Sequence, residues 1–162
     1  MYRALTTVFV IGSLASPLVS LAAAGQNGKM TRQRIAIEER VDTLTGKGTW
    51  RLIPLTPGPI SRDSGKVVCT TRVVGTAMRE GARVTLIVGH HELTGKRGTI
   101  TISQEVESAD VALGSAYSTD VGAWKLRRGT SACADLHGGG RFAAVGLPSG
   151  TVLARQEGWV SS

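Results

Sequence analysis

The chain has few aromatic residues for its length. Aromatic side chains make up 4% of the 162 residues, too few to build the stacking platform on which many proteins bind single-stranded nucleic acid. There are 19 basic and 12 acidic residues, which gives a net charge of +7. The basic residues are scattered among apolar ones and form no dense block. We therefore expect no nucleic-acid partner.

Cysteines and histidines are also scarce, with two of the first and three of the second. Cys69 and Cys133 are too far apart in the sequence to form a CxxC redox or zinc motif. His90 and His91 are adjacent, so on a strand their side chains would point to opposite faces. We therefore predict no metal site and no cofactor.

Long apolar runs are absent except at the N-terminus. Met1-Tyr2-Arg3 is a short basic start, residues 4–21 are uncharged and mostly apolar, and Ala22-Ala23-Ala24 supplies small residues of the kind that precede a cleavage site. We predict a signal peptide over residues 1–24, a secreted protein, and no stable membrane insertion after cleavage. The alternative is an uncleaved anchor, because the run approaches the length that crosses a bilayer.

Export bears on the two cysteines, because both would enter an oxidising compartment. A Cys69–Cys133 disulfide is then the simplest outcome, and two buried free thiols are the alternative. Residues 25–32 are mostly polar and lack periodicity, which predicts a flexible leader. We expect residues 33–162 to form a single domain, because two domains would each be small.

Short runs rich in Val, Ile and Thr, separated by Gly, Pro, Asp and Ser, indicate β-strands joined by turns. Residues 34–43 fit either a strand or a helical face, and we favour a strand. Further strands are predicted over residues 48–54, 66–75, 82–93, 98–107, 121–128, 140–147 and 151–160. The pattern predicts an all-β domain of about eight antiparallel strands, a barrel or a sandwich. Closure into a barrel would remove exposed sheet edges.

Period-two alternation assigns side chains to the faces of these strands. Ile100 and Ile102 share one face of their strand, while Glu105 and Glu107 share the other, so the two carboxylates are expected on a solvated face rather than as a catalytic pair. Trp50 and Trp124 each precede a leucine by two residues. This spacing favours core packing, with stacking on a ligand as the alternative.

The most suggestive stretch for a site is residues 84–92. Val84, Leu86, Val88, His90 and Glu92 share one face of a continuous strand. If that face is the interior, His90 and Glu92 lie at a barrel mouth about 7 Å apart, where they could transfer a proton or anchor a ligand. The alternative is a solvated strand end. His90 and Glu92 are thus candidate catalytic residues, and the candidate ligand-binding residues are Trp50, Trp124, Val88 and His90.

Residues 124–141, Trp-Lys-Leu-Arg-Arg-Gly-Thr-Ser-Ala-Cys-Ala-Asp-Leu-His-Gly-Gly-Gly-Arg, resemble the strand, turn, alanine-containing segment and glycine-rich exit of allene oxide cyclase-like and dirigent-like barrels. Residues 93–102, Leu-Thr-Gly-Lys-Arg-Gly-Thr-Ile-Thr-Ile, resemble the strand entry of uncharacterised bacterial secreted proteins. The resemblance covers roughly residues 45–160. It implies one antiparallel eight-stranded β-barrel whose lumen can hold a small apolar molecule. Allene oxide cyclases isomerise an oxylipin and dirigent proteins steer phenoxy-radical coupling; both commonly oligomerise, so a homo-oligomer is also implied.

Three functions from different classes fit these observations. We favour a secreted, non-catalytic barrel that binds a small hydrophobic ligand in its lumen, because no complete catalytic constellation is visible. One alternative is a cyclase, isomerase or dirigent-like enzyme with His90 and Glu92 as acid and base. The other is a structural or cell-wall-associated protein that acts through its basic exterior.

Overall fold

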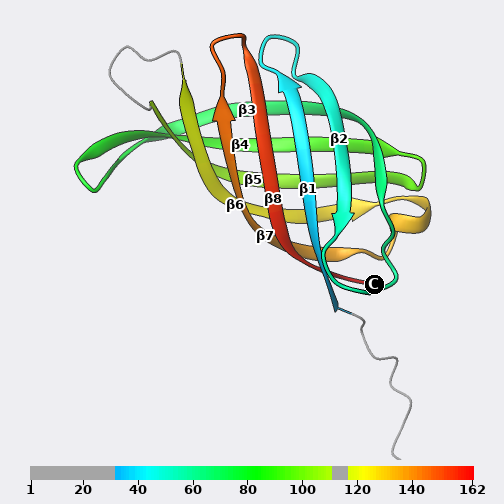
Figure 1. The fold of residues 1–162 in the computed structure, drawn as a ribbon. Coiled ribbons are helices and arrows are strands. Elements are labelled where there is room, and N and C mark those ends of the chain that lie inside the picture. Colours follow the sequence, from blue (N-terminus) through cyan, green and yellow to red (C-terminus); the bar gives the residue numbers. More distant parts are fainter. Residues whose placement is uncertain (1–31, 111–116) are drawn as a thin grey trace, which may run out of the picture.

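The chain folds as one closed antiparallel barrel of eight strands (Figure 1). It is described from a computed structural model, in which residues 32–110 and 117–162 are described. The elements are β1 (Arg32–Asp42), β2 (Lys47–Pro54), β3 (Asp63–Arg79), β4 (Ala82–Gly95), β5 (Gly98–Asp110), β6 (Ser118–Gly129), the short 3-10 helix η1 (Ser131–Cys133), β7 (His137–Gly146) and β8 (Thr151–Ser161). Each strand pairs with the next, and β8 pairs with β1 to close the barrel.

The predicted all-β barrel is therefore confirmed, and the sandwich is excluded. The strand favoured over residues 34–43 is present as β1, which ends at Asp42. The strand predicted over 66–75 is longer, because β3 runs from Asp63 to Arg79 with an irregular register between Val73 and Gly75. The predicted signal peptide, residues 1–24, and all but the last residue of the predicted leader lie outside the described residues. No helix within the described ranges is long and apolar enough to span a membrane.

Alternation along the strands supplies the core. Ile35 and Ile37 of β1 face inward, as do Ile100, Ile102 and Val106 of β5, and all five side chains are buried. Glu105 of β5 is exposed on the outer face, as predicted. Glu107, two residues further along the same face, pairs with Arg79 of β3.

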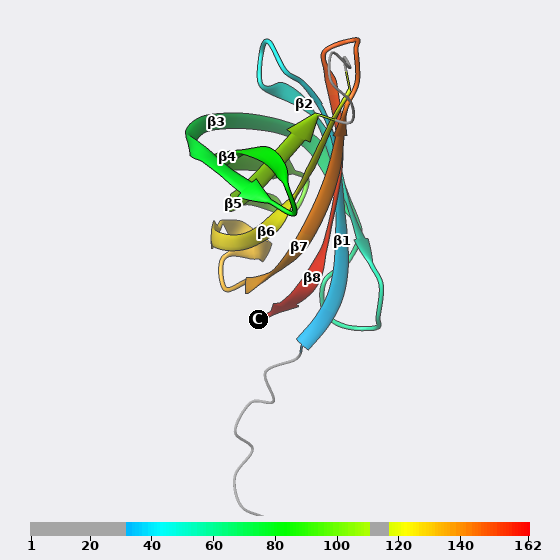
Figure 2. The same cartoon turned by 90° about the vertical axis from the view of Figure 1, so that its left-hand side faces the viewer.

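The core closes one end of the barrel. Gln33, at the start of β1, is buried and holds the β2–β3 loop: its Nε2 donates to the carbonyls of Thr56 (2.9 Å) and Ile60 (3.1 Å), while its Oε1 accepts from Ile60 N at 2.8 Å. Ile60 and Leu136 are buried with the core here. The C-terminus lies at this end, opposite the β1–β2 turn, as Figure 1 and the side view in Figure 2 show.

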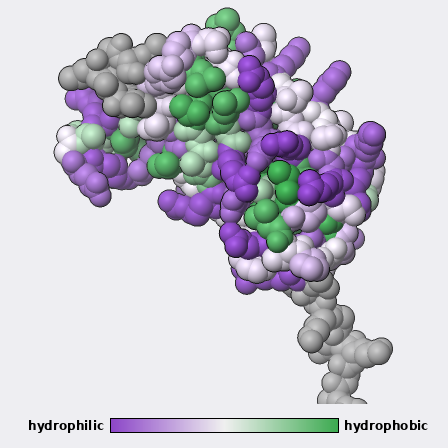
Figure 3. Space-filling view, viewed as in Figure 1, coloured by the Kyte–Doolittle hydropathy of each residue, from purple (hydrophilic) through white to green (hydrophobic). Residues whose placement is uncertain are grey.

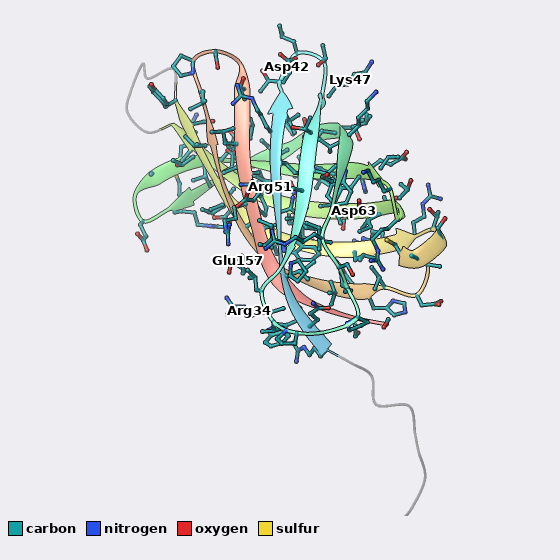
Figure 4. The ribbon with its side chains drawn as sticks, turned by 45° about the vertical axis from the view of Figure 1, so that its right-hand side comes forward. Arg34, Asp42, Lys47, Arg51, Asp63 and Glu157 are labelled. Carbon is teal, nitrogen blue, oxygen red and sulfur yellow. The ribbon has the colours of Figure 1, made fainter. Side chains whose placement is uncertain are left out.

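Charged side chains cross the outer face of β8, β1 and β2. Arg34 pairs with Glu157 at 3.0 Å, Arg155 pairs with Glu157 at 2.8 Å and with Glu38, and Arg51 pairs with Glu38. Figure 4 shows Arg34, Arg51 and Glu157 on this side of the barrel. In Figure 3 the same side carries hydrophilic groups interleaved with small hydrophobic patches. Hydrogen bonds from arginine lower the pKa of Glu38 and of Glu157.

Candidate functional site

A cavity of about 460 Å³ lies at the end of the barrel that carries the β1–β2 turn. We call it the cup. Its apolar lining includes Val41, Ile87, Val106, Phe142 and Ala144. The turn residues 42–46 form part of its rim. The apolar core fills the other end of the barrel, where the C-terminus lies. The barrel is therefore closed at that end and hollow at the end that carries the β1–β2 turn.

The rim is tied to the wall of the cup by backbone hydrogen bonds. Gly46 has a φ of +65°, a conformation that favours glycine, and a Cβ there would lie 2.4 Å from the carbonyl oxygen of Cys69. This close approach lets Cys69 N donate to Gly46 O at 2.7 Å. Thr43 N donates to Gly150 O at 2.8 Å, which joins the β1–β2 turn to the β7–β8 turn.

Three side chains in the lining of the cup form one chain of hydrogen bonds. Cys69 of β3 and His91 of β4 are register partners, and Cys69 Sγ lies 2.9 Å from His91 Nε2. His91 Nδ1 lies 2.7 Å from Glu39 Oε2, and the Glu39 side chain is fully buried. Gln156 Nε2 donates to the other carboxylate oxygen of Glu39.

These contacts determine which nitrogen of His91 carries a proton. A carboxylate can only accept hydrogen bonds, so Nδ1 of His91 donates to Glu39. In the neutral imidazole the remaining nitrogen, Nε2, is then an acceptor, and the thiol of Cys69 donates to it. Burial, with a contribution from the charge of Glu39, raises the pKa of the Cys69 thiol to about 12. The thiol is therefore neutral, and with a neutral imidazole it lies beside a nitrogen that can accept its proton.

The same donor atoms could be considered as metal ligands, since those of Glu39, Cys69 and His91 lie within 4.8 Å of one another. Glu39 contacts Nδ1, however, whereas Cys69 contacts Nε2 on the other side of the ring. An ion held between sulfur and Nε2 would have two of these residues as direct ligands, whereas catalytic zinc sites usually have three protein ligands. The geometry suits a proton relay better than a metal centre.

Two further polar groups in the lining of the cup are buried without a partner among the described residues. They are Nε2 of Gln104 and Oδ1 of Asp120. Gln104 is the register partner of Gly89, and a Cβ on Gly89 would lie 3.3 Å from His91 Nε2 and 3.5 Å from Gln104 Oε1. The glycine thus leaves space between the imidazole and the amide. Buried groups of this kind are costly unless something pairs with them.

The structure corrects the predicted site on β4. His90 and Glu92 are exposed, and neither lines the cup; His91 faces inward instead. The face was misassigned because β4 carries apolar residues on both sides. Leu93, which is completely buried in the core opposite Val67, determines that the odd-numbered residues here point inward. An acid–base pair of His90 and Glu92 inside the lumen is therefore wrong.

The other predicted ligand-binding residues also lie away from the cup. Trp50 and Trp124 are each 3% exposed and belong to the core, where their Nε1 atoms donate to the carbonyls of Thr94 and Glu157, both at 3.2 Å. Val88 is half-buried on the outer side of β4, next to the inward-facing Gly89. Core packing, the interpretation favoured for the two tryptophans, is what the structure shows.

The predicted Cys69–Cys133 disulfide is not formed, because both cysteines are free thiols. Cys69 lines the cup, whereas Cys133 of η1 lines a small pocket at the closed end with Ile60 and Leu136. The strand order carries the two residues to opposite ends of the barrel. The alternative of two free thiols is the one observed, with Cys133 buried and Cys69 half-buried.

Sequence reasoning missed Glu39, Gln104 and Gln156. A signal was present for the first of these: β1 alternates Gln33, Ile35, Ile37, Glu39 and Val41 on one face. An acidic residue between apolar ones, here between Ile37 and Val41, predicts either a break in the strand or a buried, paired carboxylate.

Comparison of the chain with protein-family models, with curated proteins and with solved structures finds no match. What the cup does is therefore inferred from its own residues.

Proposed function

We propose that this chain is a binding protein whose cup takes a small molecule with an apolar body and one hydrogen-bonding end. The observation that carries the proposal is Nε2 of Gln104, which has no partner in the part of the chain that the structure describes; Gln104 is 5% exposed and lies in a cavity with largely apolar walls. Ligand pockets commonly combine apolar walls with a few convergent polar groups. A polar end group bound near Gln104 would satisfy the amide that the protein leaves unpaired.

The charge of the lining narrows the class of ligand. Glu39, Asp42 and Asp120 all line the cup, and no Lys or Arg does so among the described residues. The chain as a whole carries a net charge of +7, so the cup differs in sign from the average exterior. An anionic ligand would be repelled at close range. We therefore infer a neutral or cationic ligand, which argues against fatty-acid anions.

Export remains part of this proposal. The signal peptide predicted over residues 1–24 would place the binding activity outside the cell. A homo-oligomer, implied by the resemblance, also stays a prediction.

Binding can be measured with the neutral dye N-phenylnaphthylamine, whose fluorescence rises in apolar surroundings. Ala144 of β7 lines the cup, whereas its neighbour Ala143 is exposed on the outer face. Ala144→Leu should therefore weaken dye binding by filling the cup, while Ala143→Leu, the matched control, should leave it unchanged. Decanol and decylamine should displace the dye more effectively than decanoate.

Equal weakening by the two leucine variants would show that the dye binds outside the cup and would overturn the proposal. The same conclusion would follow if the wild-type chain gave no saturable fluorescence increase. Preferential displacement by decanoate would contradict the inferred charge selectivity.

A further inference from the structure

Binding alone does not use the hydrogen-bonded chain that runs from Cys69 through His91 to Glu39. We propose that Cys69 is the nucleophile of a hydrolase that acts on small neutral esters or thioesters held in the cup, with His91 as general base and Glu39 as positioning residue. The inference rests on the proposed function, because the substrate must first enter the cup. The hydrolase proposal adds a chemical reaction to the proposed binding function.

The three groups have the arrangement that nucleophilic catalysis requires. A nucleophile within hydrogen-bond reach of a base, and a base oriented by a third group, are the recognisable features of such sites. Here the two distances are 2.9 Å from sulfur to Nε2 and 2.7 Å from Nδ1 to the carboxylate. Gln156 holds the second carboxylate oxygen of Glu39, so the orienting group is itself fixed.

Position in the barrel makes the thiol accessible to a substrate. Glu39 and His91 are buried, whereas Cys69 is half-buried and lines the cup. The base and the orienting carboxylate are thus shielded from bulk water, and the sulfur is at the surface of the cavity. Cys133 also lines a pocket, but its sulfur lies 4.0 Å from the carbonyl oxygen of Arg97, whereas the sulfur of Cys69 contacts an imidazole nitrogen.

The reaction balances with water as the only second reactant. As Cys69 Sγ bonds to the carbonyl carbon of the ester, the thiol proton moves to His91 Nε2. Collapse of the tetrahedral adduct breaks the bond to the alcohol or thiol leaving group, which takes that proton from His91 and leaves an acyl thioester on Cys69. Water then attacks the thioester, its proton passes through His91 to sulfur, and the free acid is released.

Gln104 supplies a group that the adduct needs. The carbonyl oxygen becomes negatively charged during attack, and buried hydrogen-bond donors stabilise such an oxyanion. Nε2 of Gln104 is a buried donor with no partner among the described residues. Oε1 of the same amide borders the space beside Gly89 that His91 Nε2 also borders, so a half-turn of the amide would present Nε2 to an oxyanion there. The acidic residues that line the cup predict a preference for neutral esters over negatively charged ones.

The neutral state of the thiol sets this site apart from those that store a thiolate. Burial keeps the Cys69 pKa near 12, so attack has to be coupled to proton transfer rather than start from a preformed thiolate. We expect slow alkylation of Cys69 by iodoacetamide at neutral pH but rapid acylation by an ester that fits the cup.

The test uses the full chain and p-nitrophenyl butyrate, a small neutral ester. Wild-type protein should release nitrophenol with turnover, and intact-mass and peptide measurements on briefly reacted protein should locate one acyl group on Cys69. Cys69→Ala and His91→Ala should each lower the rate by about a hundredfold or more. Cys133→Ser and His90→Ala, which change the other thiol and the exposed neighbouring histidine, are matched controls and should leave the rate unchanged.

Glu39→Gln tests positioning separately. It should lower kcat while KM and the affinity for N-phenylnaphthylamine stay close to wild type, because the carboxamide no longer fixes the same tautomer of His91. A fall in dye affinity parallel to the fall in kcat would indicate damage to the cup and would contradict a positioning role. Circular dichroism of Cys69→Ala and Cys69→Ser checks that the loss of rate is not a loss of fold.

Failure of this inference is distinguishable from failure of the proposed function. Dye binding in the cup without acylation of Cys69 would overturn the hydrolase and leave the binding function standing, whereas absence of both would overturn the two together. An acyl group found on Cys133 or on lysine would also overturn it. So would activity that appears only with added zinc and disappears with a chelator, since sulfur and imidazole would then serve as metal ligands.

Discussion

At the scale of single residues, the floor of the cup is the region around Glu39, where buried polar side chains pair with one another. Glu39 would be costly inside a barrel on its own, and two donors, His91 Nδ1 and Gln156 Nε2, compensate it. Each partner therefore depends on the others, because removing one leaves a buried group unpaired. This mutual dependence keeps the imidazole in one orientation beside Cys69.

The raised pKa of Cys69 has a consequence for stability. In the unfolded chain the thiol has its ordinary pKa of 9.0, whereas in the folded barrel the value is about 12. Between these values the unfolded state loses its proton and the folded state keeps it, so folding stability falls as the pH rises above about 9. The loss should approach about 1.4 kcal/mol per pH unit.

Urea unfolding of wild type and Cys69→Ser between roughly pH 8 and roughly pH 10.5 measures this contribution, because serine does not titrate there and other titrations largely cancel. The wild-type advantage over Cys69→Ser should shrink by up to about 2 kcal/mol across this range. Burial also raises the pKa of Cys133, so Cys133→Ser, compared in the same way, should show a change of the same sign and serves as a second buried thiol at the closed end. A difference between wild type and Cys69→Ser that stays constant with pH would contradict a buried, neutral thiol.

Part of this site could be predicted from the sequence, and part could not. The inward face of β5 followed from alternation alone, because only one side of that strand near Ile100 and Ile102 is consistently apolar. On β4 both sides carry apolar residues, so alternation could not decide between His90 and His91. Only pairing across the sheet, which buries Leu93 against the core, decides it, and pairing is not a local property of the sequence.

At the scale of elements, β1 links the two ends of the barrel. Its inward face carries Gln33 at the closed end and Glu39 at the floor of the cup, with Ile35 and Ile37 between them. The two polar residues play different parts. Gln33 fastens a loop over the core, whereas Glu39 orients a side chain toward the cavity.

Gln33→Leu should open the closed end. The substitution keeps the size of the side chain but leaves Ile60 N and the carbonyls of Thr56 and Ile60 without their buried partner. We expect a loss of about 2–4 kcal/mol in the free energy of unfolding. Urea unfolding measures the loss, and the amide hydrogen of Ile60 should exchange faster.

Arg40→Leu is the matched control for this change, since it introduces the same side chain at an exposed position of the same strand. Its effect on stability should stay within about 0.5 kcal/mol. If both leucine variants lost the same stability, the β2–β3 loop would not depend on Gln33. Unchanged exchange at Ile60 in Gln33→Leu would lead to the same conclusion.

At the scale of the whole molecule, closure of the sheet allows one end to be filled and the other hollow. Most strands were predictable because runs rich in Val, Ile and Thr lie between turn residues, although β3 and β4 extend further than the predicted ranges. The closure itself was favoured by the general cost of exposed edges and implied by the resemblance to eight-stranded barrels. It depends on β1 pairing with β8 along eleven residues of register from Arg32 to Asp42, which no local pattern encodes.

This closure predicts that the barrel tolerates a circular permutation. Arg32 and Ser161 are register partners at the closed end, so a short Gly/Ser linker can join them. New termini at the β3–β4 turn, between Glu80 and Gly81, fall where the chain is exposed, and such turns accept chain breaks best. The permutant should keep the β-rich circular dichroism spectrum, cooperative unfolding and dye binding.

A second permutant, opened between Ile37 and Glu38, should fail to fold, because that break divides the strand that joins the core to the floor of the cup. Comparison of the two permutants distinguishes two possible sources of the stability of the barrel. If the stability lay mainly in sequential hairpins, both would fold comfortably, since each keeps nearly all of its hairpins. If it lies in the closed sheet around a common core, only the break at the exposed turn leaves β1 continuous between β8 and β2, and only that permutant should retain a cup that binds N-phenylnaphthylamine.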